Sequence, residues 1–159
     1  MIKLNRTTEY GLVALRHISR KHSEAPTEVT SAREIADFYG LPFEITAKTL
    51  QRLKDTGLIQ SAHGARGGYT LHRSLKDVSL AEFLELMEGP QSVVMCATAT
   101  DHSPTECEYG GRCEIRNFMG KLNSRIFKFL SEIQLADLAE TSHDTLVSLT
   151  DFTHKEEVR

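Results

Sequence analysis

Residues 31–71 read SAREIADFYGLPFEITAKTLQRLKDTGLIQSAHGARGGYTL, and this stretch decides the fold. Ser31 and Glu34 form a capping box, which opens a helix that stops at Gly40. A second helix runs from about residue 43 to about residue 56. Two short helices joined by a tight turn that contains glycine predict a helix-turn-helix.

A β-hairpin is predicted directly after these helices. Residues 58–61 and 69–71 are short strand-like runs, and a segment that contains HGARGG lies between them. A hairpin that follows a helix-turn-helix is a wing, and the combination is more specific than either part. The sequence therefore predicts a mainly α-helical winged helix-turn-helix with a small β-hairpin wing.

Two further helices flank this stretch. Residues 7–22 form a helical pattern, with Glu9 in the first turn, where the helix dipole favours an anion. Ser79 and Glu82 make a second capping box, which opens a helix that Gly89 ends.

The longest helical pattern runs from Glu114 to about Ala139. Its apolar residues are spaced alternately four and three apart: Ile115, Met119, Leu122, Ile126, Phe129 and Ile133. This spacing gives nearly three heptads of a coiled-coil seam. A helix this long on so small a domain predicts pairing with a second copy in a C2 homodimer.

Composition is that of an ordinary soluble protein, with 40% hydrophobic and 26% charged residues among 159. No apolar run is long enough to span a bilayer, and the start lacks a signal-peptide pattern. We therefore expect a cytoplasmic protein with no membrane partner. The net charge is -3, yet residues 48–73 hold five Lys or Arg against the one acid Asp55. A basic segment inside an acidic protein fits binding to double-stranded DNA.

The second helix of the pair is the expected recognition helix, whose N-terminal half enters the major groove. We expect its exposed positions to be Glu44, Thr46, Lys48, Thr49 and Arg52, and its core positions to be Ile45, Leu50 and Leu53. The threonine hydroxyls could touch base edges or phosphate, and Lys48 and Arg52 suit guanine or phosphate. In the wing, Gly67 and Gly68 would let the backbone approach DNA closely, and Arg66 would probe the groove. The alternative is a helical pair with a hairpin that serves protein contacts.

All three cysteines, Cys96, Cys107 and Cys113, fall in a loop-like run with no apolar periodicity. An odd number and close spacing argue against a disulfide framework and for a metal or a reactive thiol. Gaps of ten and five residues are not the tight C-x-x-C of a zinc knuckle. An iron–sulfur cluster, zinc, a redox switch and three unrelated thiols remain open at this point.

Three thiolates leave a cluster one protein ligand short. His102 lies inside the cysteine loop, and Glu106 and Glu108 flank Cys107. Glu9 is a more distant candidate, for which a favourable charge at a helix N-terminus is an equally good explanation.

The chain thus divides into four parts by residue number. These are a winged helix-turn-helix DNA-binding domain (1–90), a cysteine-bearing sensor loop (91–113), a dimerisation helix (114–140) and a polar tail (141–159). No nucleophile–base pair stands at a motif spacing, and no Gly-rich phosphate loop follows a strand. We therefore expect neither an enzyme nor a small-molecule substrate.

The chain resembles the Rrf-type winged-helix transcriptional regulators, the bacterial family that includes IscR, NsrR and RirA. The resemblance covers about residues 1–138 and rests on TTEYGLVAL, AREIADFYGLPFEITAKTLQRLKDTGLI, GARGGYTL, SLAEFLELMEG and three cysteines before a long helix. It implies a homodimeric regulator, a repressor or an activator, on a palindromic operator. An iron–sulfur cluster would control its DNA binding in response to iron or cluster status, redox state or nitric oxide.

Carried over by position, the resemblance implies Cys96, Cys107 and Cys113 as cluster ligands. Glu9 matches the carboxylate ligand that the partner subunit donates in NsrR-like members. This set suits a 4Fe–4S cluster, with 2Fe–2S as an alternative. The position where IscR has a ligating histidine is Arg116 here, and the ten-residue first gap is longer than the family's usual five or so, which disfavours an IscR-like set. The alternative function is a cluster-free winged-helix regulator that uses its cysteines as a thiol redox switch or a zinc site.

Overall fold

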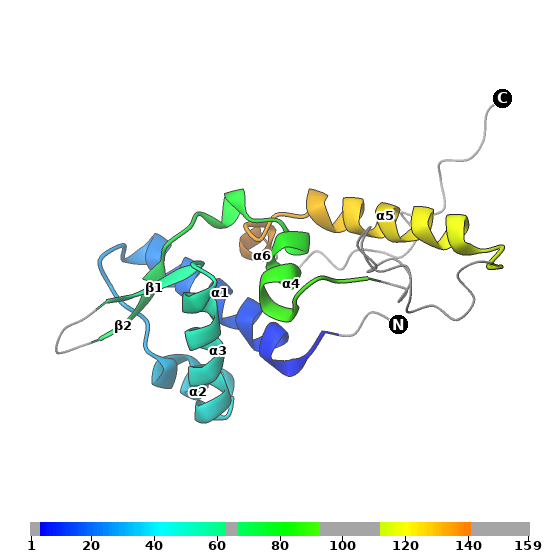
Figure 1. The fold of residues 1–159 in the computed structure, drawn as a ribbon. Coiled ribbons are helices and arrows are strands. Elements are labelled where there is room, and N and C mark those ends of the chain that lie inside the picture. The colour runs from blue at the N-terminus through cyan, green and yellow to red at the C-terminus, as the bar shows by residue number, and fades with distance from the viewer. Residues whose placement is uncertain (1–3, 63–66, 93–111, 141–159) are drawn as a thin grey trace.

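The computed structural model describes residues 4–62, 67–92 and 112–140 (Figure 1). Its elements are α1 (Arg6–Glu24), α2 (Ala32–Tyr39), α3 (Phe43–Asp55), β1 (Ile59–Ala62), β2 (Gly68–Leu71), the 3-10 turn η1 (Leu75–Asp77), α4 (Leu80–Glu88), α5 (Arg116–Glu132) and α6 (Asp137–Glu140). The predicted fold class is confirmed: the chain is mainly helical and carries one antiparallel hairpin after a helix-turn-helix. Within the described ranges, no helix is long and apolar enough to cross a membrane.

The helix starts follow from local capping. The Ser31 hydroxyl accepts a hydrogen bond from the Glu34 backbone N–H at 3.1 Å, and the hydroxyl of Ser79 accepts one from Glu82 at 3.2 Å. Both satisfy a backbone donor that a helix start would otherwise leave without a partner. The sequence pattern therefore predicted both helix starts correctly.

The wing pairs β1 with β2 in the register Ile59↔Leu71 to Ala62↔Gly68. Its base is tied to the segment before α2, since the backbone N–H and C=O groups of Thr30 and Tyr69 bond reciprocally at 2.8 and 3.0 Å. A Cβ on Gly68 would lie 2.8 Å from the Thr30 carbonyl oxygen. Glycine is thus required at position 68 by this close approach of two backbone segments.

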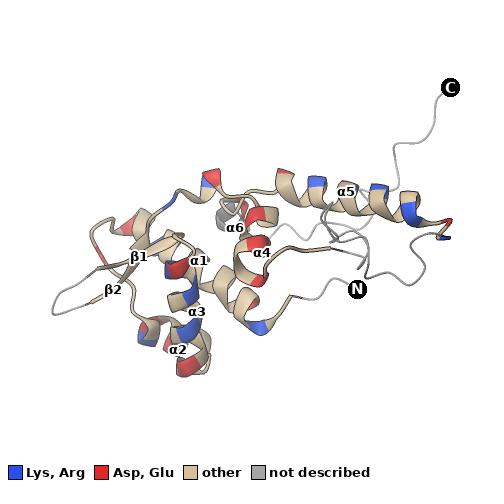
Figure 2. Ribbon diagram, in the orientation of Figure 1, with Lys and Arg blue, Asp and Glu red and all other residues tan. Residues whose placement is uncertain are grey.

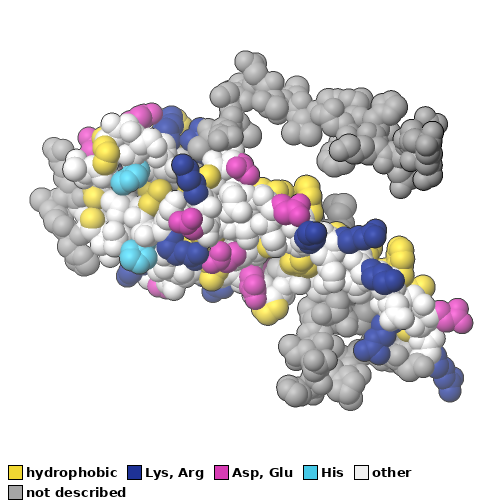
Figure 3. Space-filling view, turned by 90° about the horizontal axis from the view of Figure 1, so that it is seen from above, with side chains coloured by type: hydrophobic (Ala, Val, Ile, Leu, Met, Phe, Trp, Pro, Cys, Tyr) yellow, Lys and Arg dark blue, Asp and Glu magenta, His cyan; other side chains and the backbone are white. Residues whose placement is uncertain are grey.

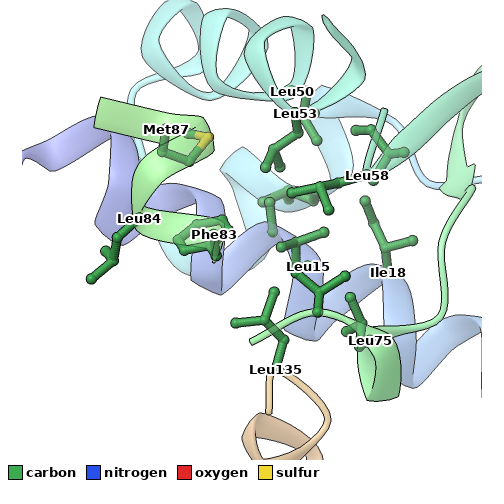
Figure 4. Close-up of a cluster of buried hydrophobic side chains, with 14 residues drawn as sticks. Leu15, Ile18, Leu50, Leu53, Leu58, Leu75, Phe83, Leu84, Met87 and Leu135 are labelled. Atoms are coloured by element: carbon green, nitrogen blue, oxygen red, sulfur yellow. The ribbon is translucent and has the colours of Figure 1, made fainter. Parts of the chain in front are cut away.

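The core lies where α1 meets α3, α4 and the wing (Figure 4). Leu15 of α1, Leu50 and Leu53 of α3, and Phe83 of α4 are all fully buried within it. Leu50 and Leu53 therefore face the core as the sequence predicted. Because α1 contacts both α3 and α4, a displacement of α1 can be transmitted to either.

The long C-terminal helix ends earlier than the sequence predicted. Instead of continuing to about Ala139, α5 stops at Glu132, and Ile133 takes an extended conformation. The backbone then bonds to the segment before α4: Leu80 N–H donates to the Ile133 carbonyl and Leu135 N–H donates to that of Val78. Leu135 is 1% exposed and fills the core of the winged module (Figure 4). This long-range pairing outweighs the local helical pattern, and α5 extends away from the wing (Figure 1).

Candidate functional site

The exposed side of α3 is the centre of the candidate DNA interface. Lys48 and Arg52 are exposed, as expected, and so is Glu44. Figure 2 shows the basic residues of α3 on the same part of the molecule as the hairpin. On α2, the guanidinium carbon of Arg33 lies 4.3 Å from the centre of the Phe43 ring, which places a third cation near the start of α3.

The expected exposure of Thr46 and Thr49 was wrong. These residues are 1% and 0% exposed, and their hydroxyls donate to the carbonyls of Pro42 and Ile45 at 3.0 and 2.8 Å. A hydroxyl bonded to the preceding turn of its own helix is satisfied, so the rest of the threonine can pack inside. Ile45, expected in the core, is 40% exposed instead.

Arg52 connects α3 to the end of α4. Its Nη2 donates to the carbonyl oxygens of Leu86 and Met87 at 3.4 and 3.3 Å. These carbonyls lie in the last turn of α4, the negative end of its dipole, where a cation is favoured. In the same turn, the Glu88 carboxylate accepts from the backbone N–H of Asn5, the N-cap of α1, at 3.1 Å. The end of α4 therefore bonds to both α3 and the start of α1.

The wing residues are only partly described. Arg66 lies outside the described residues, whereas Gly67 and Gly68 lie within them. The lack of a side chain at Gly68 is explained by the Thr30 carbonyl next to it, which the sequence did not reveal. The expected DNA contacts of these residues remain predictions.

Two of the four expected cluster ligands, Cys96 and Cys107, lie outside the described residues, together with His102, Glu106 and Glu108. The other two are accessible. Cys113 is a half-buried free thiol just before α5, and Glu9 is an exposed carboxylate in the first turn of α1. Within the described ranges Glu9 makes no side-chain hydrogen bond or ion pair, and no group of three His, Cys, Asp or Glu residues could hold a metal. Cysteine thiolates are the usual protein ligands of iron–sulfur clusters, and carboxylate oxygens also bind iron, so both donor types fit such a cluster.

A second polar cluster joins α1 to α2, and the sequence analysis missed it. Lys21 Nζ donates to both carboxylate oxygens of Glu34 at 2.7 and 2.9 Å and to the Val29 carbonyl at 3.0 Å. His17 is buried, and its Nε2 lies 3.3 Å from the Glu34 carboxylate. Partial burial raises the pKa of Glu34, but the hydrogen bonds from Lys21 and His17 together outweigh it and lower that pKa below its usual value. Thirteen or more residues separate Glu34 from both partners, so no local pattern indicated the cluster.

Replacing Glu34 by glutamine is expected to lower the free energy of unfolding at neutral pH by up to about 1 kcal/mol, because the carboxylate is about one-third exposed. A carboxylate whose pKa is depressed in the folded state stabilises above its unfolded pKa, and that contribution is lost as pH falls through the folded value. The difference between wild type and Glu34→Gln should therefore vanish in acid. Urea unfolding at a series of pH values measures it.

Glu28→Gln is the matched control, because the Glu28 carboxylate is 3.6 Å from the same Lys21 but well exposed. Its effect should be smaller at every pH. If both variants lowered the free energy of unfolding equally, the Glu34 hydrogen bonds would add no stability beyond that of a nearby negative charge.

Comparison with known proteins adds an independent line of evidence. Residues 4–141 match the family model Rrf2, described as an iron-dependent transcriptional regulator. The transcriptional repressor NsrR of Streptomyces coelicolor is 27% identical over 151 residues, which cover 92% of this chain and 97% of NsrR. The transcriptional regulator IscR of Vibrio atlanticus is 23% identical over 137 residues, 86% of this chain and 75% of IscR.

Solved structures share the fold. CymR, the global cysteine regulator of B. subtilis, superposes with a TM-score of 0.69 at 25% identity, and the match covers 89% of this chain and 99% of CymR. IscR of T. potens superposes with a TM-score of 0.63 at 22% identity, covering 95% and 96% of the two chains. The likeness to CymR agrees with the family match that the chain is a transcriptional regulator. The likeness to IscR of T. potens supports the fold alone.

Proposed function

Because the chain belongs to the Rrf2 family of transcriptional regulators, we propose that it is a homodimer whose affinity for a palindromic DNA operator is controlled by an iron–sulfur cluster. It is a regulator and not an enzyme, like the relatives described above. The observation that carries the DNA-binding proposal is the exposed face of α3, with Lys48 on it and a wing following it. A cytoplasmic location belongs to the same proposal, because the operator would be there.

The cluster proposal assigns Cys96, Cys107 and Cys113 of one subunit as thiolate ligands and Glu9 of the other as the carboxylate ligand. The family description, the relationship to NsrR and IscR, and the accessibility of Cys113 and Glu9 support it. A bound cluster would give the protein a centre that responds to iron supply, redox state or nitric oxide. A 4Fe–4S cluster suits three thiolates and one carboxylate, and 2Fe–2S is the alternative.

The dimer proposal uses α5. No residue of α5 is fully buried. Phe118 and Phe129 on one side of it, and Ile115 just before it, are 65%, 53% and 61% exposed. Half-buried Leu122 and Ile126 continue this apolar stripe. Figure 3 shows apolar and basic side chains exposed together along α5. A stripe with coiled-coil spacing on a projecting helix suits the same stripe of a second copy across a twofold axis.

The contacts of α4 suggest how cluster state would reach DNA. In the cluster-bound dimer, Glu9 would hold the first turn of α1 against the partner's cysteine loop. Without that bond the start of α1 could shift, together with Asn5, which is bonded to Glu88 at the end of α4. Arg52 links that end of α4 to the recognition helix. Two positions of α3 would bind the operator differently, and the ratio of affinities is expected to be about 5- to 150-fold.

The decisive experiment starts from protein purified without oxygen. We expect visible absorption with stoichiometric iron and acid-labile sulfide. We also expect affinity for a duplex selected from a randomised library to change when air or nitric oxide removes that absorption. Protein that stays colourless after anaerobic treatment with iron and sulfide would exclude the cluster proposal.

The second candidate function is a cluster-free regulator that senses through cysteine thiols or holds zinc. The likeness to CymR, the global cysteine regulator, supports it. Colourless protein whose DNA affinity changes between reduced and oxidised thiols, or on zinc removal, would favour this candidate.

Lys48→Ala is expected to weaken DNA binding for all duplex sequences and to lower the slope of log affinity against log salt by about 1, as loss of one phosphate contact does. Fluorescence anisotropy at several salt concentrations measures it. Lys54→Ala removes an exposed lysine on a different side of α3 and serves as the matched control. Equal salt slopes for both variants and wild type would remove Lys48 from the interface.

A further inference from the structure

The first turns of α3 expose apolar side chains where hydroxyls were expected. Ile45 is 40% exposed, while Thr46 and Thr49 turn inward and satisfy their hydroxyls on their own helix. The threonines therefore cannot present hydroxyls to a base edge. The exposed surface of this part of α3 is formed by Ile45 and its exposed neighbours instead.

On the exposed surface of α3, Ile45 has the cation Lys48 and the acid Glu44 as neighbours. Lys48 lies one turn further along α3 on the same exposed side. Phe43 is also exposed, but the Arg33 guanidinium covers its ring at 4.3 Å. The aliphatic side chain of Ile45 therefore shares its side of α3 with Lys48, whereas Arg33 and Phe43 lie on another side of the first turn, because residues two apart on a helix do not face each other. Phosphates beside a groove would satisfy these cations, which an apolar protein surface would not.

The major groove offers one apolar group on a base edge, the C5-methyl group of thymine. The N-terminal part of a recognition helix is the part that approaches base edges. We propose that Ile45 reads a thymine methyl group in each half-site of the operator, with Lys48 on an adjacent phosphate or guanine. This inference rests on the proposed DNA-binding function and adds a specificity-determining residue to it.

The test removes the methyl group from the DNA and the side chain from the protein. The probe is a duplex selected from a randomised library by the wild-type protein. Each thymine is then replaced in turn by deoxyuridine, which lacks only the methyl group. We expect one position per half-site at which wild type loses about 4-fold in affinity, the effect of no longer burying one methyl group on binding. Ile45→Ala should bind the parent duplex more weakly and show no loss at that position.

Two further variants keep the result interpretable. Lys48→Ala should bind more weakly but still lose affinity on deoxyuridine substitution, because it retains Ile45. Ile45→Val should keep most of the wild-type sensitivity, because it retains a branched apolar side chain, and a circular dichroism spectrum of Ile45→Ala like that of wild type would exclude misfolding of the alanine variant. A wild type insensitive to every substitution, or an Ile45→Ala variant with wild-type sensitivity, would overturn the inference while leaving DNA binding intact. A wild type that selects no duplex would overturn the proposed function as well.

Discussion

Phe129→Glu is expected to convert the dimer into a monomer and to weaken operator binding by about 100-fold or more. Phe129 is 53% exposed in the single chain, so the substitution should leave the fold intact. In a twofold dimer built on the α5 stripe, two carboxylates would be buried without partners, which is strongly unfavourable. Each subunit would then bind its half-site alone and lose the gain from joint binding. Analytical ultracentrifugation and DNA-binding measurements would report the two effects.

Ser124→Glu is the matched control, because it adds the same charge to an exposed residue of α5 off the apolar stripe. It should remain dimeric and bind DNA as wild type does. A dimeric Phe129→Glu variant would show that the subunits associate through another surface. Unaltered DNA affinity in a monomeric variant would contradict the proposal that two subunits bind a palindromic operator together.

Cys113→Ala is expected to abolish visible absorption, iron and sulfide in anaerobically prepared protein. DNA affinity should then be the same before and after treatment with iron and sulfide, because the proposed cluster loses one of its three thiolates. Cys113 is half-buried and lies outside the hydrophobic core, so the melting temperature of the cluster-free protein should change little. Absorption spectroscopy, iron and sulfide assays and circular dichroism together measure these outcomes.

Glu114→Gln changes the neighbouring exposed residue and should keep both the cluster and the change in affinity. Glu9→Gln is intermediate: we expect a cluster that forms but is lost faster in air, because only the carboxylate ligand is replaced. A Cys113→Ala variant that retains full absorption would remove this cysteine from the ligand set. A variant that fails to fold would show that residue 113 serves the structure instead.

The parts of the fold that local chemistry specifies could be predicted from the sequence. The capping residues Ser31 and Ser79 each bond within three residues, and the glycine-containing turn of the helix-turn-helix is equally local. The end of α5 could not be predicted, because it depends on Val78 and Leu80, which are more than 50 residues away.

The exposed side of α3, the candidate DNA interface, was predicted correctly for Glu44, Lys48 and Arg52 but not for its other residues. Treating threonine as polar placed Thr46 and Thr49 outside and Ile45 inside, since the pattern does not show whether a hydroxyl finds a partner within its own helix. The contact of Arg52 with α4 also escaped the sequence analysis, because 34 residues separate it from Leu86. The three cysteines marked a candidate site, whereas the proposed role of Glu9 would depend on a second subunit and was favoured only by the family resemblance.

After α5 the chain comes back to the winged module at Leu135, and this bears on how such a protein could evolve and where it can be truncated. Because Leu135 completes the core and residues 133–136 bond to the segment 75–80, the DNA-binding module is not one continuous stretch. The cysteine loop and α5 together form an insertion that leaves this module after α4 and rejoins it before α6. A chain cut at residue 92 would lack a buried leucine, whereas one in which a short linker replaced the insertion would keep it. The three proposed thiolate ligands and the proposed pairing helix could therefore be gained or lost together, and Glu9 of α1 is the one proposed ligand that would stay with the DNA-binding module.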